Sequence, residues 1–374
     1  MAAAVHHTAA QRVRQRKAEH LATALEQQVE TVTGPGWHDV QLLHEALPEI
    51  DLDGIDLSAE LLGRRLAAPL VIAGMTGGHE GATAVNAALA RAAQRHGVAI
   101  GLGSQRAALV DPSLEPTYAV VREEAPDALV IGNLGAAQLI AQEGGPAALT
   151  IADLERAVAV AGCDALAIHL NVLEESVQPE GDRRARGIAE AIGEIAESLS
   201  VPVVVKETGA GMSRATALRL RDLGAAALDV GGLGGTSFAL IERLRAERQG
   251  DQRGCELGAD VAEWGIPTAV SVVAAQAAGL PLIATGGVRS GLDAAKALAL
   301  GATAAGVARP LLEAAMESDD ALDEWIGRFT RTLATVCQLT GCSTPGELRE
   351  RPLVVTGRTR AWLDDLGYET GRPE

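Results

Sequence analysis

The sequence predicts an α/β protein that folds as a single (β/α)8 TIM barrel, and two observations lead to this prediction. Eight short apolar runs recur between Pro69 and Pro310, and each ends in glycine or polar residues. Stretches rich in Ala, Leu, Glu and Arg separate the runs, and closing glycines such as Gly97 mark helix ends. Eight strand–helix units favour a closed barrel over an open doubly wound sheet, which remains the alternative.

The eight runs have the character of parallel strands that are buried on both faces. They are apolar without strict alternation, as expected where helices cover the outside of a sheet and side chains fill its inside. In chain order they occupy residues 69–78, 98–106, 128–135, 165–171, 201–209, 226–235, 280–289 and 303–310.

Three regions follow from the position of this repeat. Residues 66–312 form the barrel, residues 1–65 form an N-terminal extension across one end of it, and residues 313–374 form a C-terminal helical cap with a polar tail. The connection 238–280, between the sixth and seventh strands, is too long for one crossover and predicts a small insertion over the active face.

Composition argues against several kinds of partner. The formal charge of −17, with no long basic stretch, argues against nucleic acid. No apolar run is long enough to span a membrane and no signal peptide is evident, so we expect a cytoplasmic protein without a membrane partner. The four cysteines lack the spacing of a zinc site or a disulfide framework. A small phosphorylated ligand remains possible, because a few cations in a cleft outweigh distant acidic groups.

Polar residues end the first three strands, where this fold carries its chemistry. The glycine of the first strand end lets a planar ligand approach the backbone and the threonine offers a hydrogen bond, although a tight turn alone is the alternative. The hydroxyl, amide and guanidinium groups that end the second and third strands suit the edge of a flavin beside an anion. The asparagine that ends the third strand could instead be a turn residue. These residues are Gly74, Met75, Thr76, Ser104, Gln105, Arg106 and Asn133.

The fifth strand ends in Lys206, which needs an anionic partner in a buried position. Near the N1 and O2 edge of a flavin it would stabilise the reduced, anionic cofactor. A structural ion pair of Lys206 with Glu207 or Asp229 is the alternative.

The ends of the seventh and eighth strands predict a phosphate site. A glycine-rich turn leads from Gly287 through Val288 and Arg289 into a helix, and the eighth strand ends in Ala308 and Arg309. Backbone amides of such a turn bind phosphate, and these two loops are the usual phosphate site of the fold. FMN, a sugar phosphate and a nucleotide fit this signal equally well.

The fourth strand is followed by an acidic cluster that includes His169, Asn171, Glu174 and Glu175. Carboxylates this dense repel one another unless a cation or proton lies among them, and hard oxygen ligands favour Mg²⁺ that phosphates also hold. A solvated acidic loop is the alternative.

An N-terminal motif places Arg16, Lys17 and His20 about one helical turn apart. Alone, such a motif is typical of a solvated basic helix.

Together these segments resemble the type 2 (FMN-dependent) isopentenyl diphosphate isomerases. The resemblance extends from Arg16 to Arg309 and includes, in order, RKAEH, GMTGG, GSQR, IGNLG, HLNxxxE, QPEGD, VKExGxG, GGTS, WGIPTA and GGVRSGLD. It implies conversion of isopentenyl to dimethylallyl diphosphate with FMN, NADPH and Mg²⁺. It also implies a homo-oligomer, a tetramer or octamer, whose N-terminal extension closes over the substrate.

The resemblance further implies a role for each matching residue. It assigns the acid–base step to Glu174, His169 and Asn171, and the metal to Glu175. The substrate contacts would be Arg16, Lys17, His20, Ser104, Gln105, Arg106 and Glu174. The FMN contacts would be Gly74, Met75, Thr76, Ser104, Asn133, Lys206, Thr236, Gly287, Val288, Arg289, Ala308 and Arg309.

Two positions depart from the family pattern. Members commonly have glutamine where this chain has Glu174, and tryptophan where it has Phe238. With Glu175 on the metal, we expect Glu174 to face the alkene in an apolar pocket, protonated and able to donate a hydrogen bond as the glutamine amide does.

Three other functions are alternatives to the isomerase. An FMN-dependent 2-hydroxy acid oxidase needs a His/Arg pair near the seventh strand, where the run 270–289 has the arginine and no histidine. A purine-nucleotide dehydrogenase needs a cysteine after the sixth strand, and GGLGGTS has none. A non-catalytic flavin or diphosphate binder would be compatible with the change at Glu174.

Overall fold

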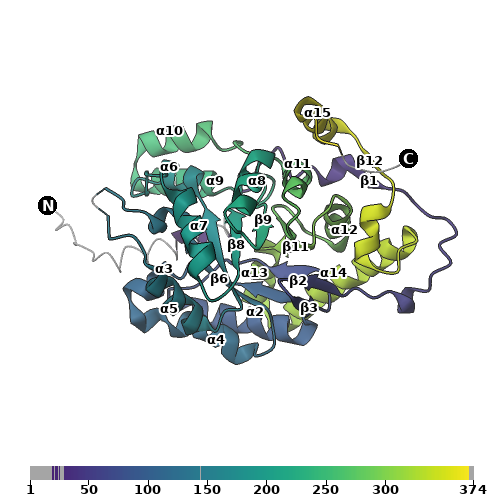
Figure 1. The fold of residues 1–374 in the computed structure, drawn as a ribbon, viewed down its shortest axis with the longest axis horizontal. Helices are drawn as coiled ribbons and strands as arrows, with labels where there is room; N and C mark the ends of the chain where they lie inside the picture. Colours follow the sequence, from purple (N-terminus) through teal and green to yellow (C-terminus); the bar gives the residue numbers. More distant parts are fainter. Residues whose placement is uncertain (1–18, 21, 24, 26–28, 144, 370–374) are drawn as a thin grey trace.

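Eight parallel strands close into a barrel in the computed structural model (Figure 1), which describes residues 19–369 except 21, 24, 26–28 and 144. The order around the barrel is β10-β11-β4-β5-β6-β7-β8-β9, so β11 pairs with β4 and closes the sheet. The fold prediction is therefore confirmed. The strands are β4 (Leu70–Ile72), β5 (Ala99–Gly101), β6 (Val130–Gly135), β7 (Ala165–Leu170), β8 (Val203–Glu207), β9 (Ala227–Asp229), β10 (Leu282–Thr285) and β11 (Ala304–Val307).

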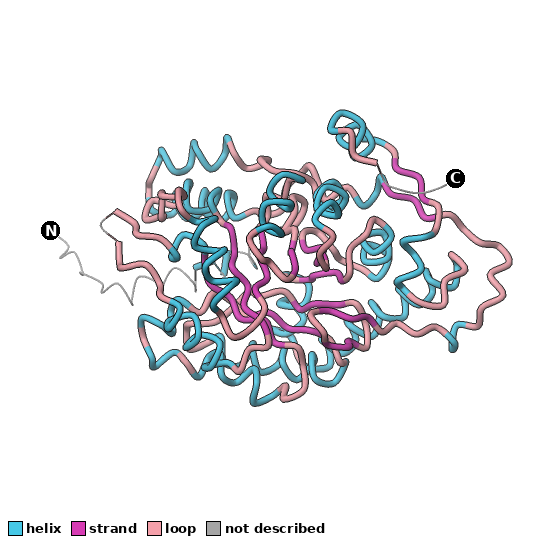
Figure 2. The backbone as a smooth tube through the Cα atoms, in the orientation of Figure 1, coloured by secondary structure: helices cyan, strands magenta, loops and turns pink. Residues whose placement is uncertain are grey.

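Helices surround the strands (Figure 2) and follow them in the expected alternation. Several begin at the N-caps that the sequence offers: Thr150 and Asp153 form a capping box before α5, and Ser290 caps α12. The outer helices are α2 (Ala82–His96), α3 (Arg106–Val110), α4 (Pro116–Glu124), α5 (Ile151–Ala161), α6 (Val172–Val177), α7 (Ile188–Ser198), α8 (Arg214–Asp222), α12 (Gly291–Ala299) and α13 (Arg309–Glu317).

Strand register brings together the residues that end neighbouring strands. His169 of β7 pairs with Gly135 on one side and with Lys206 on the other, and Lys206 in turn pairs with Asp229 of β9. The carboxyl ends of these strands therefore place an imidazole, an ammonium and a carboxylate in one row.

A short hairpin closes the opposite end of the barrel. Strands β2 (Ala59–Leu61) and β3 (Arg64–Leu66) pair around the turn at Leu62, and Leu61 and Leu66 pack against apolar side chains at the starts of the barrel strands. Only the carboxyl end is therefore available for a deep pocket in the part of the chain that the structure describes.

The connection 238–280 forms the expected insertion, with α9 (Phe238–Gln249), α10 (Gln252–Asp260) and α11 (Thr268–Ala275). The C-terminal part contains α14 (Asp319–Leu339), β12 (Leu353–Val355) and α15 (Gly357–Leu366). Figure 1 shows β12 beside β1 (Val40–Leu42), with which it pairs antiparallel. Between residues 19 and 369, no described helix combines the length and apolar character needed to cross a bilayer.

Gly77, in the loop after β4, provides a test of packing at the rim. Its φ is +148°, and a Cβ added there would collide with the ring of the buried Tyr118. We expect Gly77→Ala to lower the free energy of unfolding by about 1–3 kcal/mol more than Gly63→Ala, because overpacking adds to backbone strain. Gly63 is the matched control: its φ is +73° and no atom lies within 4 Å of the added Cβ. Urea unfolding of both variants measures the difference, and equal losses would contradict the proposed clash.

Candidate active site

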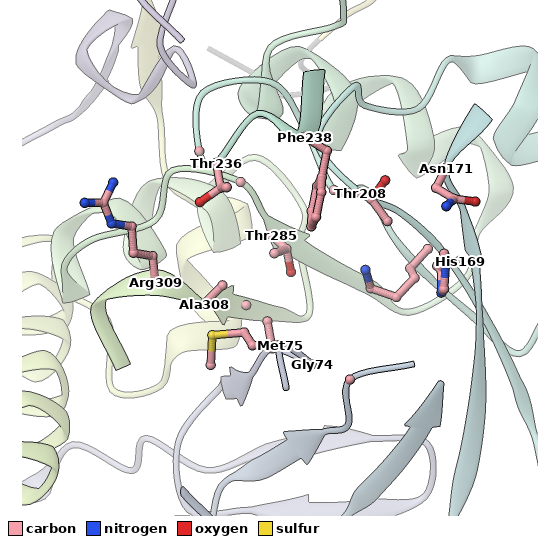
Figure 3. Close-up of a pocket in the computed structure, with 18 of the residues that line it drawn as sticks. Gly74, Met75, His169, Asn171, Thr208, Thr236, Phe238, Thr285, Ala308 and Arg309 are labelled. Carbon is pink, nitrogen blue, oxygen red and sulfur yellow. The ribbon is translucent and has the colours of Figure 1, made fainter. Parts of the chain in front are cut away.

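A pocket lies at the carboxyl end of the barrel, and most of the predicted site residues line it. Figure 3 shows Arg309 and Thr236 at one end of this pocket and His169 and Asn171 at the other, with Phe238 between them. The predicted residues at the pocket wall are His20, Gly74, Met75, Thr76, Ser104, Arg106, Asn133, His169, Asn171, Glu174, Glu175, Lys206, Thr236, Gly287, Val288, Arg289, Ala308 and Arg309. Arg16 and Lys17 lie outside the described residues.

Gln105 does not line the pocket. Its side chain is buried, its Nε2 donates to the carbonyl of Ala157 (2.7 Å), and its Oε1 accepts from the amide of Asn133 (3.0 Å). The glutamine therefore holds the end of β6 in place, and its amide is not directed at a ligand in this structure.

Asn133 orients His169. The Asn133 Nδ2 donates to the carbonyl of Leu102 (2.9 Å), which leaves its Oδ1 as the acceptor for His169 Nδ1 at 2.8 Å. His169 Nδ1 must then carry the proton in this contact. Asn133 thus fixes both the orientation and the tautomer of the imidazole.

Lys206 lies beside the buried Asp229 and the partly buried Glu207. Its Nζ donates to the carbonyl oxygen of Glu207 (3.1 Å), and its charge opposes the rise that burial causes in the pKa values of Glu207 and Asp229. Among the described residues Lys206 forms no ion pair within 4.0 Å with either carboxylate, and its side chain lines the pocket.

Glu207 shapes the loop that follows β8. One of its carboxylate oxygens accepts the amides of Thr208 (2.6 Å), Gly209 (2.7 Å) and Ala210 (2.5 Å). Burial nevertheless raises the pKa of Glu207 to about 7, against these hydrogen bonds and Lys206. The pocket wall therefore carries a carboxyl group that changes charge near neutral pH.

The acidic end is organised by Asn171. Its Nδ2 donates to Glu175 (3.0 Å) and to Glu174 (3.2 Å), and the amide of Asp182 donates to Glu175 (2.8 Å). Glu175 is buried and lines the pocket, so its carboxylate is held in a fixed position.

The surroundings of Glu174 differ from the apolar pocket expected from the sequence. Ligand atoms of Glu174, His20 and Glu242 lie within 4.8 Å of one another, and His20 Nε2 contacts Glu242 Oε1 at 2.6 Å. Phe238 supplies an apolar side, with its ring edge-on to His20 at 5.9 Å between centroids. Glu174 therefore lies at a border between polar groups and one aromatic ring.

Arg245 joins the N-terminal residues to this end of the barrel. It is buried and pairs with Glu242 (2.5 Å), Glu180 (2.9 Å) and Glu19 (3.1 Å). Burial alone would lower the pKa of Arg245, but these carboxylates raise it above its ordinary value. The network holds His20 against α9, because the Glu242 carboxylate contacts both His20 and Arg245.

The other end of the pocket has the features of a phosphate site. Gly286 and Gly287 have φ values of +120° and +69°, conformations that favour glycine, and the first turn of α13 has no side-chain cap. Arg289 and Arg309 lie at the same end. A glycine-rich turn together with guanidinium groups is well suited to a phosphate dianion.

Several lining residues were not selected from the sequence. Thr208 and Thr285 lie within the strand-end motifs, which could have revealed them. Glu30 and Gln138 carry no recognisable motif, and only their position in the fold places them here.

Similarity to known proteins shows the family of this chain. The family of FMN-dependent dehydrogenases matches residues 9–172 and 174–355. An isopentenyl-diphosphate delta-isomerase of Methanoregula boonei is 47% identical over 94% of this chain and 96% of its own, and one of Methanosarcina mazei is 47% identical over 94% and 95%. The chain belongs to the type 2 isopentenyl-diphosphate isomerase family.

Solved structures agree on the fold. A lactate oxidase of Pediococcus acidilactici superimposes with a TM-score of 0.66 over 93% of this chain and 94% of its own, at 17% identity. The chain thus shares its barrel fold with this oxidase.

The pocket fits the FMN that this family uses. Its two ends differ, with Arg309 at one and His169 and Asn171 at the other (Figure 3), which suits a ligand with a phosphate at one end and a polar ring at the other. Met75 and Ala308 form one apolar wall and Phe238 faces it, while Lys206 and Thr76 offer donors. Such a mixture of apolar faces and a few polar groups is typical of flavin sites.

The raised pKa of Glu207 leads to a prediction about stability. Because the folded-state pKa of about 7 lies above the ordinary 4.5, this carboxyl group stabilises the fold fully below about pH 4.5, and that contribution is lost as pH rises through about 7. Glu207→Gln cannot titrate, so its stability relative to the parent protein should rise by about 1–3 kcal/mol between pH 5.5 and 8.5. Denaturant unfolding at both pH values measures this, with Glu197→Gln on the exposed face of α7 as control. A pH-independent difference would contradict the prediction.

Proposed function

We propose that this protein converts isopentenyl diphosphate to dimethylallyl diphosphate, using FMN reduced by NADPH, and Mg²⁺. The observation that carries the proposal is the pocket itself, which joins a phosphate-binding end at Arg289 and Arg309 to a rigid polar end at His169, Asn171 and Glu175. Relatives that are 44–47% identical over nearly the whole chain carry the name of this isomerase.

The proposed FMN contacts divide into two groups. The phosphate would bind at the turn after β10 and the start of α13. The ring would lie against Met75 and near Lys206, whose charge favours an anionic reduced flavin. The full set is Gly74, Met75, Thr76, Ser104, Asn133, Lys206, Thr236, Gly287, Val288, Arg289, Ala308 and Arg309.

The diphosphate of the substrate would bind among Ser104, Arg106 and His20, with Arg16 and Lys17 completing the cation set. Arg106 pairs with Asp182 at 3.1 Å, so it is already oriented at the pocket wall. Glu175 would supply a carboxylate oxygen to Mg²⁺, and one protein carboxylate with phosphate oxygens and waters is the usual coordination of this ion. Closure of these groups over the diphosphate would exclude water from the reacting alkene.

The reaction shifts a double bond without net redox change. FMN, when bound and reduced, supplies the acid–base chemistry at the alkene. The protein orients the substrate through its diphosphate, and Asn171 holds Glu174 and Glu175 in fixed relative positions. His169, with its tautomer set by Asn133, is available to hold a proton beside the flavin site.

We further propose that the protein acts in the cytoplasm as a homo-oligomer, a tetramer or octamer. The acidic surface implied by a formal charge of −17 is consistent with the proposed lack of a nucleic-acid partner.

An assay with purified protein tests the proposal. We expect FMN to remain bound after desalting, and isopentenyl diphosphate to be converted only when FMN, NADPH and Mg²⁺ are all present. Lactate and mandelate, which the structurally similar oxidases suggest as substrates, should not reduce the bound flavin. Flavin reduction by either acid, or flavin binding without isomerisation, would favour an oxidase or a non-catalytic binder instead.

Variants of the adjacent Glu174 and Glu175 test whether the two carboxylates have different roles. Glu175→Gln should lower turnover about a hundred-fold or more and weaken the dependence on Mg²⁺, because it removes the proposed metal ligand. Glu174→Gln keeps shape and hydrogen bonding and introduces the residue that relatives commonly have, so turnover should stay within about ten-fold. Measuring kcat against Mg²⁺ concentration decides between them, and equal losses in the two variants would contradict this division of roles.

A further inference from the structure

Glu30 occupies an unexpected position at the phosphate end of the pocket. Its Oε2 lies 2.7 Å from an Arg289 guanidinium nitrogen, and its Oε1 lies 4.0 Å from one of Arg309. Glu30 also lines the pocket. One carboxylate therefore faces both arginines that we propose to hold the phosphate of FMN.

The backbone around Glu30 holds this carboxylate in place. Glu30 forms a bridge with Thr236, and the amide of Ser237 donates to the carbonyl of Val29 at 2.7 Å. The amides of Val32 (2.8 Å) and Thr33 (2.9 Å), which follow Glu30 closely in the chain, donate to the Glu263 carboxylate. The segment 29–33 is thus fastened across the loop after β9, and Glu30 projects from it toward the arginines.

We infer that Glu30 competes with the phosphate of FMN for Arg289 and Arg309, and so lowers the affinity of this protein for FMN. A carboxylate and a phosphate are both acceptors for the same guanidinium donors, and like charges brought together at one site repel. Arg289 cannot serve both fully, because two of its nitrogens already donate to the carbonyls of Gly287 (2.9 Å) and Gly234 (3.2 Å).

The inference rests on the proposed position of the FMN phosphate, and it concerns the phosphate alone. Riboflavin has the same ring and ribityl chain but no phosphate, so it reports on every other part of the flavin site. Comparing the two ligands isolates the interaction with Glu30.

The test is a fluorescence titration of flavin-stripped, full-length protein with FMN and with riboflavin. Glu30→Gln should bind FMN about three-fold or more tightly than the parent protein, a size expected for a partly exposed charge pair, while its affinity for riboflavin stays within about two-fold. The gain should shrink at high salt, because salt screens partly exposed charges. Unchanged or weaker FMN binding by this variant would overturn the inference.

Glu313→Gln is the matched control. Glu313 pairs with the same Arg309 at 2.7 Å and does not line the pocket, so the substitution removes one negative charge from the same guanidinium on its outer side. We expect little change in FMN affinity. A gain equal to that of Glu30→Gln would show a general effect of net charge and would overturn the inference.

The Arg309→Met variant tests the proposed position of the FMN phosphate separately from the inference about Glu30. Weaker FMN binding of about ten-fold or more, with riboflavin unaffected, would support the phosphate position. If instead Arg309→Met leaves FMN binding unchanged, the proposed phosphate position fails, and the inference about Glu30 fails with it.

Discussion

Closure of the parallel sheet is the constraint on which the rest of the structure depends. Each barrel strand is paired on both sides, so all carboxyl ends meet at one rim while the β2–β3 hairpin fills the other end. The register then sets His169, Lys206 and Asp229 side by side. Desolvation raises the pKa values of Glu207 and Asp229 despite the neighbouring lysine. The chemistry of the pocket is thus a consequence of how the barrel closes.

Long-range ion pairs complete the rim. Arg245 is buried together with Glu242, and loss of one partner of such a pair would leave an uncompensated charge at a cost of about 3–5 kcal/mol. Glu19 and Glu180 add two more carboxylates from distant parts of the chain. A buried arginine with three partners fixes geometry more than it adds stability, since desolvation offsets much of the attraction.

The barrel was predictable from the sequence because its signals are local: apolar runs of strand length recur eight times, and helical stretches with caps and glycine turns lie between them. Most of the predicted site residues line the pocket for the same reason, since strand ends coincide with the rim. Ion pairs between residues more than two hundred positions apart could not be predicted, because they produce no periodic pattern in the sequence. Arg289 with Glu30 and Arg245 with Glu19 are examples. Gln105 shows that a strand-end motif can also mislead. A polar residue there can hydrogen-bond to the backbone behind the pocket instead of lining the pocket.

The N-terminal residues contact both ends of the pocket within a short length of chain. His20 lies against Glu242 at the polar end, and Glu30, ten positions later, faces Arg289 at the phosphate end. A ligand that moves either residue acts on a segment that also contacts the other end. By linkage, any such effect would be reciprocal: the factor by which the diphosphate changed FMN affinity would equal the factor by which FMN changed diphosphate affinity. Because His20 and Glu30 lie ten positions apart, the proposed substrate and cofactor sites share one short stretch of chain outside the barrel strands.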